Sequence, residues 1–162
     1  MTLFVISDTH VPEISPGISQ DFLSQIKSDD ILFHAGDFTD MKTLKELEKR
    51  CKMYAVRGNM DDPEVRKILP EKKIVELSGK RIGIMHGWGA PTGLPDRVLG
   101  RFNGKLDLLI FGHSHAPYYK KVGSTLLFNP GSLAGDWRSK SGTYGILRLE
   151  EEKIWADLIE LR

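Results

Sequence analysis

The chain has 162 residues, of which 40% are hydrophobic and 28% are charged, and its formal net charge is +1. This length predicts one domain over residues 1–162, and no apolar run approaches the roughly 20 residues that a membrane-spanning helix needs. The near-neutral charge argues against a broad nucleic-acid-binding surface, and the single cysteine, Cys51, excludes an internal disulfide and a metal site built from thiolates.

The first half of the chain alternates predicted strands with predicted helices. Met1-Thr2-Leu3 leads directly into the first strand, so we expect no signal peptide and a cytoplasmic protein. Apolar runs predict strands over residues 2–7, 30–35 and 52–57. Helical spacing and capping residues predict helices over residues 17–27, 41–50 and 63–69, with Ser19, Asp40 and Asp62 as their N-caps.

The second half of the chain is richer in hairpins. Strands joined by short turns are predicted over residues 73–77 with 81–85, 117–122 with 125–128, and 143–149 with 154–161. A helix is predicted over residues 94–102 and a buried strand over 107–111, whereas an irregular loop is expected over 129–142. Strand–helix alternation followed by mainly antiparallel strands predicts an α/β domain with two facing mixed sheets and helices outside.

The segment Asp-Leu-Leu-Ile-Phe-Gly-His-Ser-His, residues 107–115, carries the most informative local pattern. The apolar strand ends before Gly112, so His113 and His115 follow its carboxyl end, where open α/β sheets bind ligands. Neutral imidazole is the commonest protein ligand for transition metals. A histidine in a loop is usually only hydrogen bonded, so this segment alone leaves both interpretations open.

Ligand-type residues also follow four other predicted strands, as Asp8 with His10, then Asp37, Asn59 and His86. If these strands are parallel, their ends meet at one edge of the sheets. A set of seven such residues suggests two ions, held about 3.5–4 Å apart by a bridging carboxylate. Asp37, alone in its loop, is the natural bridge. A site of His, Asp and Asn suits manganese, iron, nickel or zinc.

In chain order, Asp-X-His, Gly-Asp, Gly-Asn, His-Gly and Gly-His-X-His resemble the calcineurin-like metallophosphoesterase superfamily. The short length and the stretch Asn129-Pro130-Gly131-Ser132 are similar to its small bacterial and archaeal phosphodiesterase branch. The resemblance implies a four-layer α-β-β-α sandwich, a dinuclear metal centre and hydrolysis of a small or nucleotide-like phosphodiester by metal-bound hydroxide. It favours Mn²⁺, with Ni²⁺, Fe²⁺ or Zn²⁺ as alternatives.

The resemblance also implies a role for each ligand. The first ion is expected at Asp8, His10 and His115, and the second at Asn59, His86 and His113, with Asp37 bridging the two. Asp37, Asn59 and His86 are the expected catalytic residues among them.

One residue departs from the family pattern, because many members carry histidine after Gly-Asn and this chain carries Met60. The source of the leaving group's proton is therefore open.

Other residues near these motifs allow two interpretations. His34 is expected to be a hydrogen-bonded core or supporting histidine rather than a ligand. Asp61 could shape its turn or orient a ligand. Arg57 and Arg138 could bind a substrate phosphate or simply be solvated. Trp88 and Trp137 could line a substrate cleft or be buried in the core.

Two alternatives to a phosphodiesterase remain. One is a phosphomonoesterase, and the other is a non-catalytic scaffold, because the superfamily includes a retromer coat subunit that keeps this fold for protein interactions. The complete ligand set favours catalysis. A homodimer is also considered, since the closing hairpin carries apolar residues at a sheet edge, although we expect them to face the inner sheet; they are Ile154, Trp155, Leu158 and Ile159.

Overall fold

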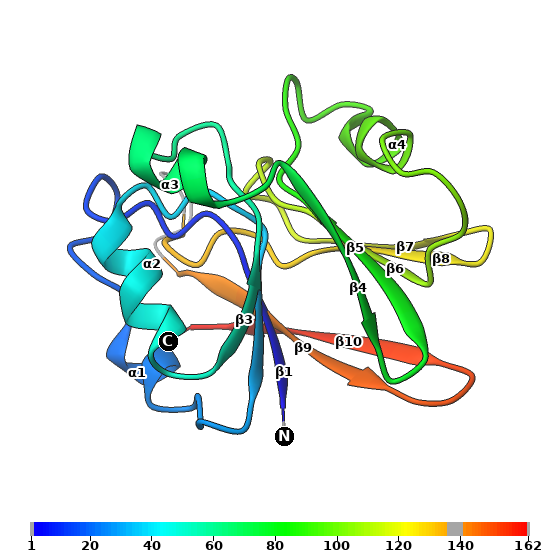
Figure 1. Cartoon of the computed structure of the whole chain (residues 1–162), viewed down its shortest axis with the longest axis horizontal. Coiled ribbons are helices and arrows are strands. Elements are labelled where there is room, and N and C mark those ends of the chain that lie inside the picture. The colour runs from blue at the N-terminus through cyan, green and yellow to red at the C-terminus, as the bar shows by residue number, and fades with distance from the viewer. Residues whose placement is uncertain (1, 136–140, 162) are drawn as a thin grey trace.

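The structure is a computed structural model that describes residues 2–135 and 141–161. Two mixed sheets of five strands each lie face to face, and helices cover their outer faces (Figure 1). Within the described part of the chain, no helix is long and apolar enough to cross a membrane. The predicted α/β sandwich of two mixed sheets is confirmed.

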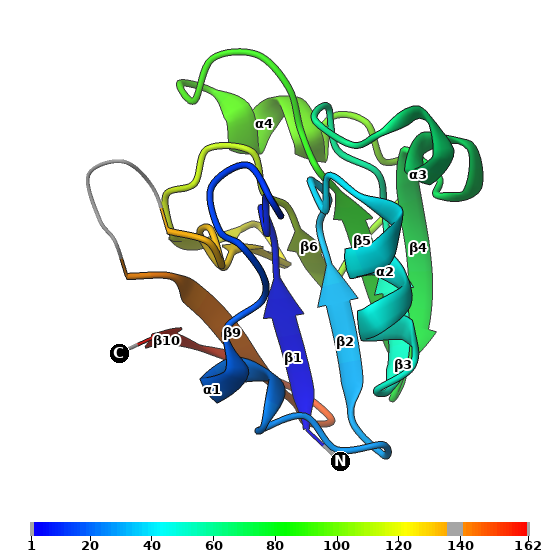
Figure 2. The ribbon, with the colours of Figure 1, turned by 90° about the vertical axis from the view of Figure 1, so that its left-hand side faces the viewer.

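The first sheet has the strand order β10-β9-β1-β2-β3. Strands β1, β2 and β3, the last of which is an edge strand, are parallel, so their carboxyl ends lie at the same end of the sheet (Figure 2). The antiparallel strands β9 and β10 extend the sheet on the other side of β1. The strands are β1 (Leu3–Ile6), β2 (Ile31–His34), β3 (Lys52–Ala55), β9 (Thr143–Leu149) and β10 (Ile154–Glu160).

The second sheet has the strand order β4-β5-β6-β8-β7. Strands β5, β6 and β8 are parallel, and the outer strands β4 and β7 pair with them as antiparallel hairpin partners. The strands are β4 (Lys72–Leu77), β5 (Lys80–Met85), β6 (Leu108–Ile110), β7 (Tyr118–Val122) and β8 (Thr125–Asn129).

Three helices lie on the outer face of the first sheet and one on the outer face of the second (Figures 1 and 2). They are α1 (Gln20–Leu23), α2 (Met41–Glu48), α3 (Pro63–Ile68) and α4 (Leu94–Leu99). Ser19 and Asp40 cap α1 and α2 as predicted, by accepting from the backbone N–H groups of Phe22 and Thr43. Asp62 is the N-cap of α3, directly before Pro63, but its side chain makes no such hydrogen bond.

Helix α1 is shorter than predicted. After Leu23 the chain tightens, because Gln25 N donates to Phe22 O and Ile26 N donates to Leu23 O, each three residues back. The apolar side chains of this segment are still buried. The helical spacing of apolar residues therefore predicted correctly which side chains are buried, but not how long the helix is.

Alternation along the strands produces three apolar cores. In β1, Leu3 and Val5 face the second sheet, whereas Phe4 and Ile6 face the helices. In the second sheet, Leu109 packs with the α4 side. Each fully buried aliphatic or aromatic side chain contributes about 1.5–3 kcal/mol, so these layers hold both sheets in place.

Only part of the closing hairpin matches the expectation that its apolar residues face the inner sheet. Ile154 packs in the core between the sheets and Ile159 packs on the helix side, whereas Trp155 and Leu158 are 38% and 46% exposed. Side chains alternate across a strand, so adjacent residues such as Ile154 and Trp155 cannot face the same layer. The homodimer stays a prediction.

Candidate metal centre

The loops that follow the strands of one sheet are tied to each other by backbone hydrogen bonds. Asp8 N donates to Gly36 O at 3.0 Å, and His10 N donates to Asp37 O at 3.2 Å. These bonds join the loops after β1 and β2, so the two aspartates sit on one connected framework.

Further hydrogen bonds connect the two sheets at the same edge. His113 N donates to Asp8 Oδ2 at 3.1 Å, and His86 Nδ1 donates to Ala35 O at 2.7 Å. The strand ends of both sheets therefore face one another across a shared site, as the sequence pattern predicted.

One side of the site is formed by Asp8, His10 and His115. Asp8 Oδ1 lies 3.2 Å from His115 Nε2 and 3.6 Å from His10 Nε2, and the two ring nitrogens are 3.1 Å apart. Their ligand atoms lie within 4.8 Å of one another, close enough to share one ion.

The other side is formed around His86. Its Nε2 lies 3.2 Å from Asp37 Oδ2 and 3.1 Å from Asn59 Oδ1. Asn59 Oδ1 also lies 3.1 Å from His113 Nδ1. Asp37 Oδ2 is 3.6 Å from His10 Nε2, so this carboxylate stands between the two sides. The structure thus brings all seven expected ligands together.

Asp8 lies close to the residues on both sides of the site, although it was expected to serve only the first side. Its carboxylate belongs to a group with His10 and His115 and also to a group with Asp37 and His86. This position follows from the parallel pairing of β1 and β2, which places the residues after both strands side by side.

The donor set fits divalent cations. Asp8 Oδ1 is one of two buried side-chain polar atoms in the described part of the chain that have no hydrogen-bond partner. A buried carboxylate oxygen without a donor is unfavourable, and a cation beside it would satisfy it. Paired imidazole nitrogens and an amide oxygen complete a set that borderline divalent metals prefer.

Backbone strain is concentrated at the same residues. Outside glycine, a positive φ is uncommon because the side chain crowds the backbone. Five of the expected ligands have it; the φ values are 55° for Asp8, 42° for His10, 58° for Asp37, 70° for His113 and 57° for His115. Strain of about 1–3 kcal/mol per residue is typical of functional sites, where it positions side chains.

Two glycines leave space for the carboxylates. A Cβ at Gly58 would overlap the side chain of Asp37. A Cβ at Gly112 would overlap Ser7 Oγ and lie 2.8 Å from Asp8 Oδ2. Each aspartate therefore packs against bare backbone from the neighbouring loop.

Charges inside the cluster shift its pKa values. Burial works to raise the pKa of Asp8, but the charge of His86 and the imidazoles of His10 and His115 hold it below its usual range. Burial works to lower the pKa of His86, but Asp8 and Asp37 raise it to about 9. The same balance raises the pKa of His10. Protons and metal ions therefore compete for these imidazoles.

A model of the calcineurin-like phosphoesterase superfamily domain matches residues 1–152 of the chain. The chain belongs to this superfamily. A probable metallophosphoesterase from Methanothermobacter thermautotrophicus is 34% identical over 161 residues, covering 98% of this chain and 92% of the relative. A phosphodiesterase from Methanocaldococcus jannaschii is 26% identical over 174 residues, covering 99% and 100%. The predicted resemblance is confirmed.

The fold also extends to proteins of distant sequence. The crystal structure of Chaetomium thermophilum Vps29 matches with a TM-score of 0.79 at 20% identity, covering 99% of this chain and 97% of that one. At this identity the likeness concerns the fold of the superfamily and not the chemistry of the site.

Supporting residues hold the ligand loops of this superfamily member. Gly36 N donates to Nδ1 of the buried His34 at 3.1 Å, and the His34 ring stacks on Phe38 with centroids 3.5 Å apart. Burial lowers the pKa of His34 to about 3, so its ring is neutral. The prediction of a hydrogen-bonded supporting histidine is confirmed.

The structure supports the turn-shaping role of Asp61. Its Oδ2 accepts from Gly58 N at 2.7 Å and its Oδ1 accepts from Thr39 N at 2.9 Å. It therefore shapes its own turn and ties the loop carrying Asn59 to the loop that follows Asp37. Burial, which outweighs these hydrogen bonds, raises the pKa of Asp61.

Two supporting contacts of Asp8 were missed in the sequence. Ser7 Oγ donates to Asp8 Oδ2 at 2.5 Å, and Ser132 Oγ donates to Asp8 O at 2.9 Å. Nothing in the pattern around Ser7 indicated its role. Ser132 belongs to the Asn-Pro-Gly-Ser stretch, which did provide a signal, and Asn129 of that stretch donates through Nδ2 to Gly112 O at 2.9 Å.

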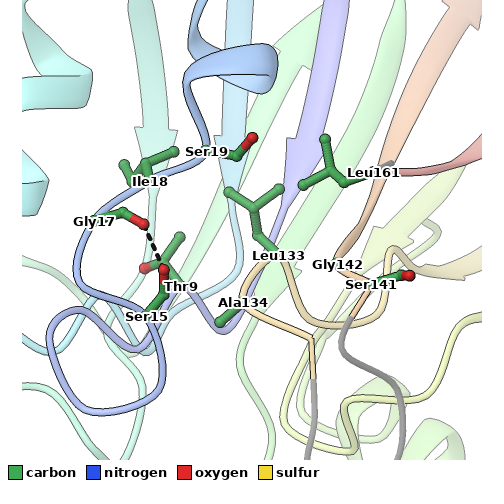
Figure 3. A pocket seen from close by; sticks show the side chains of 10 residues that line it. All are labelled: Thr9, Ser15, Gly17, Ile18, Ser19, Leu133, Ala134, Ser141, Gly142 and Leu161. Carbon is green, nitrogen blue, oxygen red and sulfur yellow. Dashed lines mark hydrogen bonds between the residues drawn. The ribbon is translucent and has the colours of Figure 1, made fainter.

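Two pockets open near the ligand loops. One, of about 280 Å³, is shared with Asn59 and His86 and is also lined by Arg57, Arg66 and Trp88. The other, of about 270 Å³, lies beside Thr9 between the β1–α1 loop and the segment after β8 (Figure 3). Its described lining is made of hydroxyl, aliphatic and glycine residues and includes no charged side chain. Trp137 and Arg138 lie outside the described residues.

Proposed function

We propose that the chain is a metal-dependent phosphodiesterase that acts through two divalent ions, with Mn²⁺ the favoured metal. The observation that carries this proposal is the convergence of seven ligand-type side chains from both sheets, with Asp37 between two groups. Membership of the superfamily and a relative named as a phosphodiesterase support it. A cytoplasmic location and a small or nucleotide-like substrate belong to the same proposal.

Two sets of residues would hold the ions. Asp8, His10 and His115 form the first set, and Asn59, His86 and His113 the second, with Asp37 shared. Two divalent ions supply an activated water near neutral pH and neutralise the phosphate oxygens of an in-line displacement.

The protein contributes orientation and a balanced charge. The amide oxygen of Asn59 faces His86 and His113 without adding a negative charge to a site that already contains two carboxylates. The hydrogen bond from His86 Nδ1 to Ala35 O directs Nε2 toward Asp37 and Asn59. Such partners fix the orientation of ligating imidazoles.

Met60 determines the class of leaving group that we propose. Its side chain is 48% exposed, and its backbone N–H donates to Asp37 Oδ1 at 2.8 Å, so the residue lies beside the centre but has no proton to give. Asp61 does not replace it, because both of its carboxylate oxygens accept backbone N–H groups. Diesters with weakly basic leaving groups, such as nitrophenolates, should therefore be the better substrates.

The test uses the purified protein treated with a chelator and then loaded with manganese. We expect close to two ions per chain and faster hydrolysis of bis(4-nitrophenyl) phosphate than of 4-nitrophenyl phosphate. Faster hydrolysis of the monoester would support a phosphomonoesterase instead. Two bound ions with no hydrolysis of either ester would support a non-catalytic scaffold.

A further inference from the structure

The pocket shared with Asn59 and His86 is also lined by residues outside the expected ligand set. We call it the arginine pocket and define it by Arg57, Arg66, Glu71 and Trp88, which line it together with those two residues. A molecule bound at the metal centre could extend into it directly, because both sites share the side chains of Asn59 and His86.

The arginine pocket carries positive charge that the chain does not neutralise. Arg57 Nη1 donates to Arg66 O at 3.0 Å, which holds this guanidinium beside α3. In residues 2–135 and 141–161, neither Arg57 nor Arg66 forms an ion pair with a carboxylate. The acidic lining residue, Glu71, is paired with Arg101 at 3.4 Å, so its charge is already offset.

The pocket also presents an aromatic surface. Trp88 is 38% exposed, and the guanidinium of Arg101 lies 5.4 Å from its ring centroid. Arg97 Nη2 donates to Trp88 O at 2.9 Å, so the loop that carries the ring is held by a second arginine. The backbone that carries the ring is therefore held before any ligand arrives, which reduces the ordering that binding requires.

We infer that the arginine pocket binds a second phosphate of the substrate through Arg57 and Arg66, while Trp88 packs against a planar ring. The inference rests on the proposed function and names its substrate class: nucleotide-type phosphodiesters that carry a phosphate besides the one being hydrolysed. Guanidinium groups bind phosphate through paired, charge-assisted hydrogen bonds. The pocket in Figure 3 lacks charged groups in its described lining and does not offer this chemistry.

The test compares the binding of two probes, adenosine 5′-monophosphate and adenosine 3′,5′-bisphosphate, to the manganese-loaded protein by isothermal titration calorimetry. We expect the bisphosphate to bind about tenfold more tightly than the monophosphate. In Arg66→Gln this preference should fall to less than about twofold, because one guanidinium is lost. In Arg57→Lys it should fall in part, because the charge stays but the paired geometry does not.

Two further variants make the result specific. Trp88→Leu should weaken both probes equally and leave their ratio unchanged. Arg148→Gln is the matched control, since Arg148 is an exposed residue on β9 that pairs with Asp157 at 3.1 Å. It should change neither affinity.

Equal affinity of the unmodified protein for both probes would overturn the inference, as would an equal loss of preference in Arg148→Gln and Arg66→Gln. Hydrolysis of bis(4-nitrophenyl) phosphate, which has no second phosphate, is measured in parallel. If the unmodified protein hydrolyses no diester, the proposed function fails, whereas the probe ratio still decides whether the arginine pocket binds a phosphate.

Discussion

The two sheets contribute unlike halves of the candidate metal centre. All of its oxygen ligands follow strands of the first sheet, and three of its four imidazoles follow strands of the second. The first half consists of Asp8, His10, Asp37 and Asn59, and the second of His86, His113 and His115.

This difference separates two tasks. The carboxylates of Asp8 and Asp37 are buried, and neighbouring imidazoles hold the pKa of Asp8 below its usual range. In the second half the pKa of His86 is raised to about 9, and His115 is more open, with 26% of its side chain exposed. We therefore expect the first half to supply the carboxylates that attract cations, and protons to compete with cations for His86 in the second half. Four predictions test this comparison, from the largest expected effect to the smallest.

The first prediction removes the charge between the two halves. Asp37→Asn should lower kcat on bis(4-nitrophenyl) phosphate by about 10²–10³-fold or more, because a charge-stabilising group at the reacting centre is lost. The number of manganese ions per chain, measured by mass spectrometry, should fall by more than one, because both sides of the site lose the shared carboxylate. Asp157→Asn, at an exposed residue of β10, is the control and should retain both activity and metal. Retention of two ions and full activity in Asp37→Asn would contradict the bridging role.

The second prediction adds an imidazole to the half that has few of them. Met60→His should accelerate alkyl diesters by up to about 10²-fold, because general acid catalysis contributes most when the leaving group is strongly basic. Aryl diesters should change much less. The measurement is the dependence of rate on leaving-group pKa in both proteins. A flat dependence in the unmodified enzyme, with chemistry limiting, would reveal a proton donor other than residue 60.

The third prediction disturbs the contact between the two halves. Gly112→Ala places a methyl group against Ser7 and Asp8, and overpacking of this kind costs about 1–3 kcal/mol of unfolding free energy. Urea denaturation of the metal-free protein measures it. Gly17→Ala is the matched control, since a Cβ there meets nothing within 4 Å. Equal stability of the two variants would show that the loops adapt freely.

The fourth prediction concerns the stability of the metal-free protein between pH 6.5 and 9. The pKa of His86 is raised from 6.5 to about 9, so its protonation stabilises the fold fully below pH 6.5 and this contribution is lost as pH rises through 9. The loss should be at most about 1.4 kcal/mol per pH unit for one proton. Urea unfolding should show a steeper slope in the unmodified protein than in His86→Asn, where the raised pKa of His10 still contributes. A slope of equal size in His86→Asn would assign the effect to other groups.

His34 gives the opposite dependence at lower pH. Its pKa is lowered from 6.5 to about 3, so the neutral ring contributes stability above pH 6.5 that is lost as pH falls toward 3. The two histidines can therefore be separated by the pH range in which each acts.

The convergence of the seven candidate ligands was predictable, because Gly-Asp, Gly-Asn or Gly-His after an apolar run marks the end of a strand without knowledge of the partner strands. The arginine pocket was predictable only in part. Arg57 and Trp88 adjoin ligand motifs, but Arg66 and Glu71 reach the pocket through the packing of α3 and its following turn. Local patterns do not report such tertiary placement.

The end of helix α1 and the exposure of side chains on β10 were also hard to predict, because both depend on more than the local sequence. Helix α1 ends at Leu23 because the next N–H groups bond to carbonyls three residues back, and no residue in that stretch signals the change. Trp155 and Leu158 resemble core residues by type, yet both are exposed although they share their faces of β10 with the packed Ile159 and Ile154; β10 is the edge strand of its sheet. Residue type alone cannot distinguish these cases.

The apolar layer between the sheets acts as a spacer for the two halves of the site. Phe33 in β2 and Ile110 in β6 lie in this layer, and each is followed within a few residues by ligands of its own sheet. Close-packed interiors transmit changes in volume instead of absorbing them. A change of side-chain size in this layer would therefore alter the gap between the carboxylates and the imidazoles, so residues distant from the proposed site would help to set the size of ion that it accepts.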